Sequence, residues 1–215
     1  GVRMSKVVLF AASLLLVAGI VNAGIINPCA GDVVFNGVEP GCYFACPQGD
    51  TDAFYQQGFW FEFTIIDLLG APVPNIPGTD FWLVDCDVLN ELALCAGSAS
   101  CAADSATNSQ GKTTMHDGSY SAGGCADGLT PVVQGFQLAD PLVGPCDPYC
   151  FNISVRSPDL SGDGLVNLVD LSEFAQAYPP QPYDTCADLD CSGLVNLVDL
   201  SSFAFHFGPP GHECQ

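Results

Sequence analysis

One short pattern is written twice near the end of this 215-residue chain, and it limits what that region can fold into. The copies run over residues 159–170 and 188–199, and nine consecutive residues, 164–172 and 193–201, are identical between them. In each copy oxygen-bearing side chains stand at positions 1, 3, 5, 9 and 12, and glycine stands at position 6. Alternate residues then point oxygen atoms inward, position 7 offers its backbone carbonyl, and the glycine permits a sharp turn. This is the pattern of a twelve-residue calcium loop.

Each copy supplies enough oxygen donors for one calcium ion. Three carboxylates crowded into one loop repel each other unless a cation lies among them. We therefore predict two calcium sites. Their ligands are Asp159, Ser161, Asp163, the Leu165 carbonyl, Asn167 and Asp170 in the first loop, and Asp188, Asp190, Ser192, the Leu194 carbonyl, Asn196 and Asp199 in the second.

An amphipathic helix is predicted after each loop. Apolar residues recur at steps of three and four over 168–178 and over 197–207, which is the spacing of one helix face. Pro179-Pro180 and Gly208-Pro209-Pro210 end the two patterns, because proline does not continue a helix. No helical pattern precedes either loop, so each unit is a calcium loop with its exiting helix alone.

This duplicated unit resembles the dockerin module (the type I repeat) over the 49 residues from Asp159 to Phe207. Dockerins are calcium-dependent modules of secreted proteins that bind cohesin modules on scaffold proteins or cell surfaces. The resemblance implies a small α-helical calcium module over 158–215 and a cohesin-like partner. The family usually has Asp or Asn where this chain has Ser161 and Ser192, so we expect calcium at both loops without extreme affinity.

Positions 10 and 11 of the loop are where dockerins of this type commonly contact cohesin. They are Leu168 and Val169 in the first copy and Leu197 and Val198 in the second. The resemblance thus implies two nearly equivalent partner-binding faces. The helical spacing offers another interpretation, in which at least one residue of each pair packs between the two helices. The sequence leaves both interpretations open.

The first 23 residues have the features of a secretory signal. Lys6 precedes the apolar run 7–20, and Val21-Asn22-Ala23 ends in a small residue before the expected cleavage point. The run is too short and wrongly flanked for a membrane span, and its retention as an anchor is the alternative. We expect a secreted protein, free or associated with the cell surface, with no membrane contact after cleavage.

All of the cysteines lie beyond the expected cleavage point, and their number, twelve, is even. An oxidising compartment makes disulfides the favoured interpretation. Cys95 and Cys101 bracket a short loop and are the predicted local bridge. At least one of the three cysteines in the repeat region must pair outside it or stay free. The predicted disulfide cysteines are Cys29, Cys42, Cys46, Cys86, Cys95, Cys101, Cys125, Cys146, Cys150, Cys186, Cys191 and Cys214.

The chain is strongly acidic. After the signal, Lys112 and Arg156 are the only Lys or Arg residues against 24 Asp and Glu residues, a formal net charge of −22. A chain without a basic patch does not bind nucleic acid, and it has no attraction to anionic membrane surfaces. Bound calcium would offset part of the repulsion, so we expect folding to depend on the metal.

Residues 24–157 are predicted to form a mainly β, disulfide-rich domain. Phe59 to Ile65 alternates as a half-buried strand does, with its apolar residues on one face. Further strands are predicted over 81–84, 131–138 and 151–155, with Gly, Pro, Asn and Asp turns between them. Short strands at this spacing favour an antiparallel β-sandwich.

Two segments of this domain are similar to bacterial immunoglobulin-like repeats. Residues 67–73 match Asp-x-x-Gly-x-Pro-Val, and residues 108–114 match Asn-x-x-Gly-x-x-Thr. The resemblance implies an immunoglobulin-like sandwich. Members of that family are mostly spacers and adhesive modules of surface proteins.

No catalytic constellation emerges, and we predict a non-enzymatic protein. The chain lacks Gly-x-Ser-x-Gly, His-Glu-x-x-His and a phosphate loop. His116, Asp117 and Ser119 make a triad only on paper, in a stretch rich in Gly and Ser. Isolated carboxylates on strands are usually solvated, and large aromatic residues there usually belong to the core. The residues concerned are Glu62, Asp85, Asp87, Trp60 and Trp82.

Three classes of function remain. The favoured one is a secreted calcium-binding structural or assembly protein whose module docks to a cohesin-like partner. The second is a self-assembling filament subunit, in which the module is an intramolecular calcium clasp and residues 24–38 are a donor strand. The third is a carbohydrate-binding or carbohydrate-active domain carried by the module.

Overall fold

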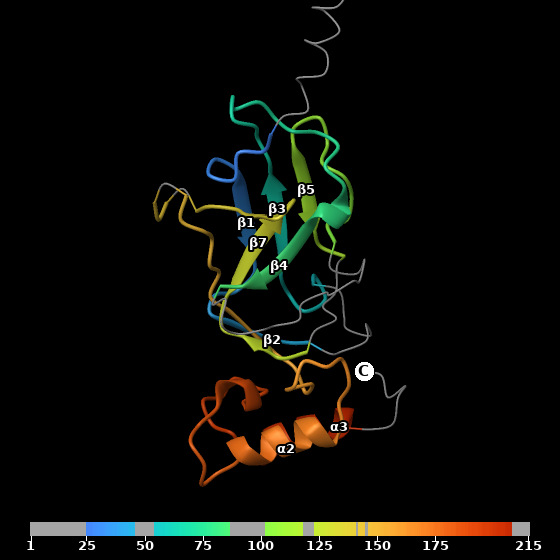
Figure 1. The fold of residues 1–215 in the computed structure, drawn as a ribbon, viewed down its shortest axis with the longest axis vertical. Coiled ribbons are helices and arrows are strands. Elements are labelled where there is room, and N and C mark those ends of the chain that lie inside the picture. Colours follow the sequence, from blue (N-terminus) through green and yellow to red (C-terminus); the bar gives the residue numbers. More distant parts are fainter. Residues whose placement is uncertain are drawn as a thin grey trace, which may run out of the picture.

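The computed structural model of the protein describes residues 25–45, 54–86, 102–117, 123–140, 142–144 and 146–207. A β-rich part, residues 25–157, stands above a smaller loop–helix part, residues 158–207 (Figure 1). The strands are β1 (Asp32–Asn36), β2 (Gly41–Phe44), β3 (Trp60–Thr64), β4 (Phe81–Asp85), β5 (Lys112–Met115), β6 (Cys125–Ala126), β7 (Leu129–Val133), β8 (Phe136–Gln137) and β9 (Ile153–Arg156). The helices are α2 (Leu168–Ala177) and α3 (Leu197–His206), with short 3-10 turns η1 (Gly78–Asp80) and η3 (Thr185–Ala187).

The first sheet has the strand order β1-β3-β5 and is antiparallel. The alternation predicted for β3 is confirmed, since Phe61 and Phe63 are buried and Glu62 between them is exposed. Phe59 and Ile65, which flank the strand, are buried as well. Because successive side chains point to opposite faces of a strand, one aromatic face of this sheet covers the core.

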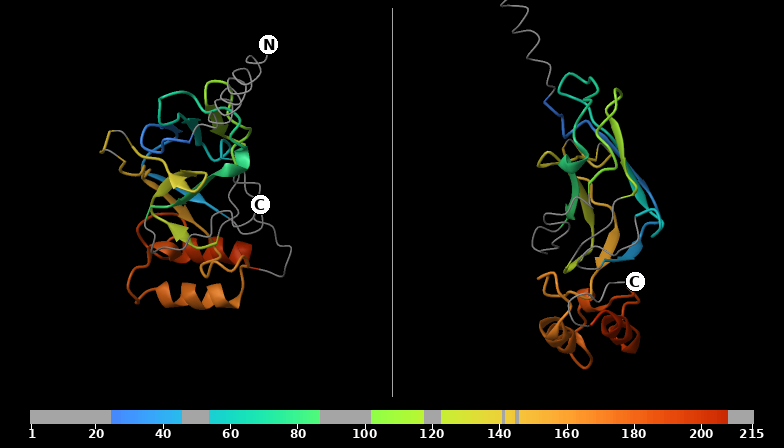
Figure 2. Two further views of the ribbon diagram at one scale, coloured as in Figure 1. Left: turned by 45° about the horizontal axis from the view of Figure 1, so that its top comes forward. Right: turned by 90° about the vertical axis from the view of Figure 1, so that its right-hand side faces the viewer.

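The second sheet, β4-β7-β8, is antiparallel and packs across the core from the first (Figure 2). The rings of Phe81 on β4 and Phe63 on β3 meet edge to face with centroids 5.1 Å apart. The sequence predicts one strand over 131–138, but Gln134 (φ 51°) and Gly135 (φ 87°) turn the chain back between β7 and β8. Two successive residues with positive φ suit the twist of a tight hairpin, so the prediction of one strand is wrong.

The third sheet, β2-β9-β6, contains a parallel pair. β2 and β9 run in the same direction, from Gly41 beside Ile153 to Phe44 beside Arg156, whereas β6 is antiparallel to β9. The expectation of a wholly antiparallel fold is therefore wrong at this sheet. Parallel strands need a long connection, and a pairing across most of the β-rich part leaves no local signal in the sequence.

Four disulfides join described cysteines, and two of them cross between the two parts of the molecule. Cys29–Cys146 and Cys86–Cys150 lie within the β-rich part. Cys42–Cys191 and Cys125–Cys186 tie the loop–helix part to β2 and β6. The prediction that a repeat cysteine pairs outside the repeats is confirmed twice. Four disulfides are typical of an oxidising compartment and indicate a secreted or extracellular protein.

The loop–helix part has a small apolar core of its own. Phe174 of α2 and Phe203 of α3 stack with ring centroids 5.4 Å apart, and both are buried. Phe44 at the end of β2 packs against this core from the β-rich part, and its ring lies 5.0 Å from that of His206. The two parts therefore share an apolar contact as well as two disulfides.

Some of the predictions concern residues that lie outside the described ones. These are the signal over 1–23, the Cys95–Cys101 bridge, Cys46, Cys214, Ser119 and Asp87. Across the described stretches, no helix has the length and apolar character needed to cross a membrane.

Candidate metal centre

The first loop folds its backbone around the carboxylate of Asp159. One carboxylate oxygen accepts the amide of Asp163 at 3.1 Å, and the other accepts the amide of Gly164 at 2.7 Å. The Ser161 hydroxyl donates to the same carboxylate at 3.3 Å. Gly162 and Gly164 have φ values of 72° and 86°, which glycine adopts without steric cost. Asp159 is completely buried in the resulting turn.

Asp170 ties the beginning of this loop to the beginning of α2. Its carboxylate accepts the backbone amides of Ser161 at 2.9 Å and of Asn167 at 2.7 Å. The Asn167 side chain accepts the amide of Val169 at 2.8 Å, which completes a capping box. The same carboxylate therefore closes the loop and starts the helix.

The second loop repeats this arrangement. Asp188 accepts the amides of Ser192 at 3.0 Å and Gly193 at 2.7 Å. Asp199 accepts the amide of Asn196 at 2.8 Å and completes the capping box of α3. The repeated sequence thus gives two copies of one local structure.

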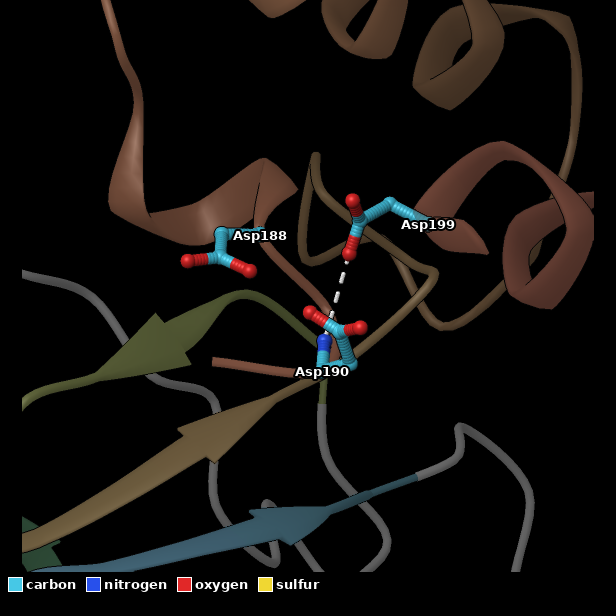
Figure 3. A group of neighbouring side chains, drawn as sticks. All are labelled: Asp188, Asp190 and Asp199. Atoms are coloured by element: carbon cyan, nitrogen blue, oxygen red, sulfur yellow. Dashed lines mark hydrogen bonds between the residues drawn. The ribbon is translucent and has the colours of Figure 1, made fainter. Parts of the chain in front are cut away.

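Three carboxylates of the second loop face a common space (Figure 3). Asp188, Asp190 and Asp199 each place an oxygen within 4.8 Å of the other two, and the Asp190 amide donates to Asp199 at 3.3 Å. Oxygen donors gathered in this way suit a divalent cation such as Ca²⁺.

The carboxylates of the first loop do not converge as closely in the described structure. Asp163 is exposed and accepts the amide of Leu165 at 2.9 Å and the side-chain amide of Asn167 at 3.4 Å. Its carboxylate is therefore engaged with the exit of its own loop, while Asp159 and Asp170 are held in place. The first loop is the less pre-organised of the two.

Position 7 presents its carbonyl to the interior of each loop. The Leu194 carbonyl accepts the Ser192 hydroxyl at 3.2 Å and the Asn196 side-chain amide at 3.1 Å. The Leu165 carbonyl accepts the Asn167 side-chain amide at 3.4 Å. Positions 5, 7 and 9 of the second loop therefore meet, and with the carboxylates they make an all-oxygen donor set, which fits calcium.

Among the described residues, no Lys or Arg forms an ion pair with a carboxylate of these loops. Arg156 pairs with Asp127 outside the loops, and Lys112 is on β5 in the first sheet. Burial, and then the nearby Asp170 carboxylate, raise the pKa of Asp159, so its negative charge is unfavourable where it lies. A divalent cation would remove that penalty. The completely or almost completely buried carboxylates are Asp159, Asp170, Asp188 and Asp199.

Tyr183 is a site residue that the sequence does not reveal. Its hydroxyl donates to the Asp188 carboxylate at 2.6 Å. Burial, and then the hydrogen bond to Asp188, raise the pKa of Tyr183 to about 12, so it remains a donor at neutral pH. The residue precedes the twelve-residue pattern, and the first copy has Ser154 of β9 at the equivalent position.

The apolar side chains at loop positions 10 and 11 face solvent in both copies. Leu168 and Val169 are 72% and 51% exposed, and Leu197 and Val198 are 71% and 54% exposed. They do not pack between the helices, although the helical spacing alone predicts that at least one residue of each pair does.

The capping carboxylates explain this orientation. Asp170 and Asp199 occupy the third position of their helices and are turned into the loops. A helix that turns its third position inward leaves its first two positions facing outward. One turn after these carboxylates, Phe174 and Phe203 stack between the helices.

The residues considered for catalysis or sugar binding lie on the β-rich part. His116 Nδ1 is 2.6 Å from the Asp117 carboxylate at the surface. Glu62 is exposed on the outer face of β3. Trp60 and Trp82 are half-buried at strand positions.

No protein-family model, no curated protein and no solved structure matches this chain. Its function is therefore inferred from its own residues. The strongest features are the two matched loops, their buried carboxylates and the exposed apolar pair beside each of them.

Proposed function

We propose that this protein is a secreted, non-enzymatic, calcium-binding assembly protein. Two calcium ions would hold the loop–helix part in shape. The exposed pair of each copy, Leu168 and Val169 or Leu197 and Val198, would be a docking face that binds another protein. The observation that carries the proposal is the pairing of two features in each copy: buried, inward-turned carboxylates and, directly before the capping carboxylate, two exposed apolar residues.

Calcium has a structural role in this proposal. Each loop contains two buried carboxylates and further oxygen donors in a ring closed by backbone amides. Without a cation these carboxylates repel one another, and with one their charge is neutralised. Because the capping carboxylates also start α2 and α3, calcium would fix the orientation of the docking face.

The docking face fits an apolar partner surface. Each copy exposes two neighbouring aliphatic side chains on a chain of strong negative charge, and burying such a pair drives association. A partner with basic residues around an apolar centre would complement the acidic surroundings. The dockerin resemblance names a cohesin-like module as that partner, with the β-rich part, an immunoglobulin-like sandwich by resemblance, as the cargo or spacer.

The contact between the two parts favours a second candidate function. Two disulfides and Phe44 hold the loop–helix part against the β-rich part, as expected of an intramolecular calcium clasp. A clasped subunit that self-associates would build a filament. The proposed donor strand is less favoured, because β1 already pairs with β3 of its own chain.

Binding to an immobilised cohesin module and light scattering in solution separate the two candidates. The chain from Gly24 onward is measured in calcium and in chelator, beside the variant Leu168→Asp with Leu197→Asp. Docking predicts calcium-dependent binding that the variant loses while it stays folded. Self-assembly predicts calcium-dependent oligomers without cohesin binding. A monomer that binds no cohesin in calcium would contradict both candidates.

A further inference from the structure

The second calcium loop contains one half of a disulfide, and the first does not. Cys191 is position 4 of the second loop and is bonded to Cys42 of β2, with the Cα atoms 6.1 Å apart. Cys186, just before that loop, is bonded to Cys125 of β6. The first loop has Gly162 at position 4. The copies differ at positions 3, 4 and 5, and position 4 is the one that links the second loop to another strand.

The backbone at Cys191 shows what this bond does. Cys191 has φ 53°, in the left-handed region, and Gly162 has φ 72° at the same position of the first loop. Glycine adopts this conformation freely, whereas a residue with a Cβ is strained in it. The disulfide to Cys42 and the hydrogen bond from the Cys191 amide to the Asp188 carbonyl at 3.2 Å oppose that strain.

The positions of the carboxylates also indicate that the disulfide holds the second loop in shape. The loop with the disulfide is the one whose three carboxylates converge within 4.8 Å. Position 4 lies directly between Asp190 at position 3 and Ser192 at position 5, both predicted ligands. Fixing position 4 therefore fixes the spacing of donors on either side of it.

The two inter-part disulfides differ in access to external thiols. Cys42 is exposed and Cys191 is half-buried, whereas Cys125 is only 6% exposed and Cys186 is half-buried. Thiol–disulfide exchange begins with attack of a thiolate on an accessible sulfur. Cys42–Cys191, the bond with the exposed cysteine, is therefore reduced more readily than Cys125–Cys186, the other tether between the two parts.

We propose that Cys42–Cys191 is a thiol-controlled lock on the second calcium loop, an inference that rests on the proposed calcium binding. An external dithiol supplies two electrons and two protons, the Cys42–Cys191 bond becomes two thiols, and the dithiol closes to its own disulfide. Cys191 is then free to leave its strained conformation, and the second loop loses calcium affinity while the first keeps it. By linkage, calcium in the second loop makes the disulfide harder to reduce.

Calcium titrations followed by NMR test the lock without altering a ligand. The amides of Gly164 and Gly193, position 6 of each loop, report each site separately. In the variant Cys42→Ser with Cys191→Ala, we expect calcium affinity at Gly193 to fall about tenfold, equivalent to about 1.4 kcal/mol, with no change at Gly164. Replacing Cys191 with Gly instead of Ala should recover part of the loss, because glycine tolerates positive φ.

The control removes a disulfide away from the loops, Cys29→Ser with Cys146→Ser, and should leave both sites unchanged. If both glycines respond to calcium and the Cys42/Cys191 variants have the same calcium affinities as the control, the proposed lock is wrong, but both loops bind calcium. If neither glycine responds in the oxidised native chain, calcium binding and the lock both fail.

A second measurement uses the native chain and needs no variant to fold. The native chain is equilibrated with mixtures of reduced and oxidised dithiothreitol, and the reduced fraction of Cys42–Cys191 is measured by thiol alkylation and mass spectrometry. We expect a smaller reduced fraction of this bond in calcium than in chelator at the same dithiothreitol ratio. Equal reduced fractions in both conditions would overturn the lock.

Discussion

Gly123 is a point at which the β-rich part touches the first loop (residues 159–170), and replacing it with alanine should damage that loop from outside. A Cβ at this buried glycine would overlap the carboxylate of Asp159 and approach the Cα of Gly162. The neighbouring Gly124 amide donates to the Asp159 carbonyl. The two segments are therefore held together and have no room for a methyl group between them.

The size of the expected loss of stability in Gly123→Ala depends on how firmly Asp159 is held. Its carboxylate is buried and accepts the amides of Asp163 and Gly164, so it cannot turn away without losing them. Overpacking costs about 1–3 kcal/mol, and weakening one hydrogen bond to a charged group adds about 1.5–3 kcal/mol. We expect the free energy of unfolding in calcium to fall by about 2.5–6 kcal/mol, with a fall in Tm of about 5–20 °C.

Gly144→Ala is the matched control. Its Cβ would also meet an Asp carboxylate, that of Asp147, but Asp147 is exposed and free to turn aside. We expect a change within about 0.5 kcal/mol. Calorimetry and urea unfolding in calcium compare Gly123→Ala with Gly144→Ala. Equal stability of the two variants would refute the contact between the β-rich part and the first loop.

Further predictions concern the loop–helix part. Phe203→Ala should lower the free energy of unfolding by about 3–5 kcal/mol, because Phe203 is 1% exposed. Phe205→Ala on the same helix removes a side chain that is 62% exposed and should change the free energy of unfolding by less than about 0.5 kcal/mol. Similar losses for the two variants in urea unfolding would show that the helices do not pack as described. When free calcium is at one hundred times the Kd of a site, removing it should lower the free energy of unfolding by about 2.7 kcal/mol for that site. An unchanged melting curve in chelator would contradict this. Burial lowers the pKa of His206. The neutral imidazole packed on Phe44 should therefore contribute stability that is present above the unfolded-state pKa of about 6.5 and is lost as the pH falls below it. His206→Gln should remove this part of the pH dependence of Tm, and an unchanged pH profile would show that His206 does not cause it.

The features that the sequence predicts correctly are those set by neighbours along the chain. The two helices begin where the capping side chains of Asn167 and Asn196 stand, and each forms over the predicted segment. The alternating strand at Phe59–Ile65 is found because its pattern has period two. In each case the deciding interactions lie within a few residues.

The features that the sequence does not predict depend on distant contacts. β1, β2, β5 and β6 are short strands that exist because a partner strand lies beside them. The pairing of Cys42 with Cys191 spans 149 residues, and spacing carries no information about it. Tyr183 belongs to the site only because the chain brings its hydroxyl to Asp188.

The exposure of Leu168 and Leu197 shows how one local rule overrides another. Apolar periodicity places both on the buried face of their helices. The capping boxes instead turn Asp170 and Asp199 inward and rotate the first helical turn so that both leucines are exposed. Hydrogen bonds to a buried charged group outweigh the burial of one aliphatic side chain.

Isothermal titration of the chelator-stripped chain with calcium tests the central claim most directly. The account predicts two calcium ions for each chain, one of which is lost in Asp199→Asn and the other in Asp170→Asn. Magnesium at the same concentration should compete weakly, because it demands near-ideal octahedral geometry at short distances and gives up its bound water reluctantly. Binding of no calcium by the native chain, or full binding by both variants, would contradict the claim that these two loops are calcium sites.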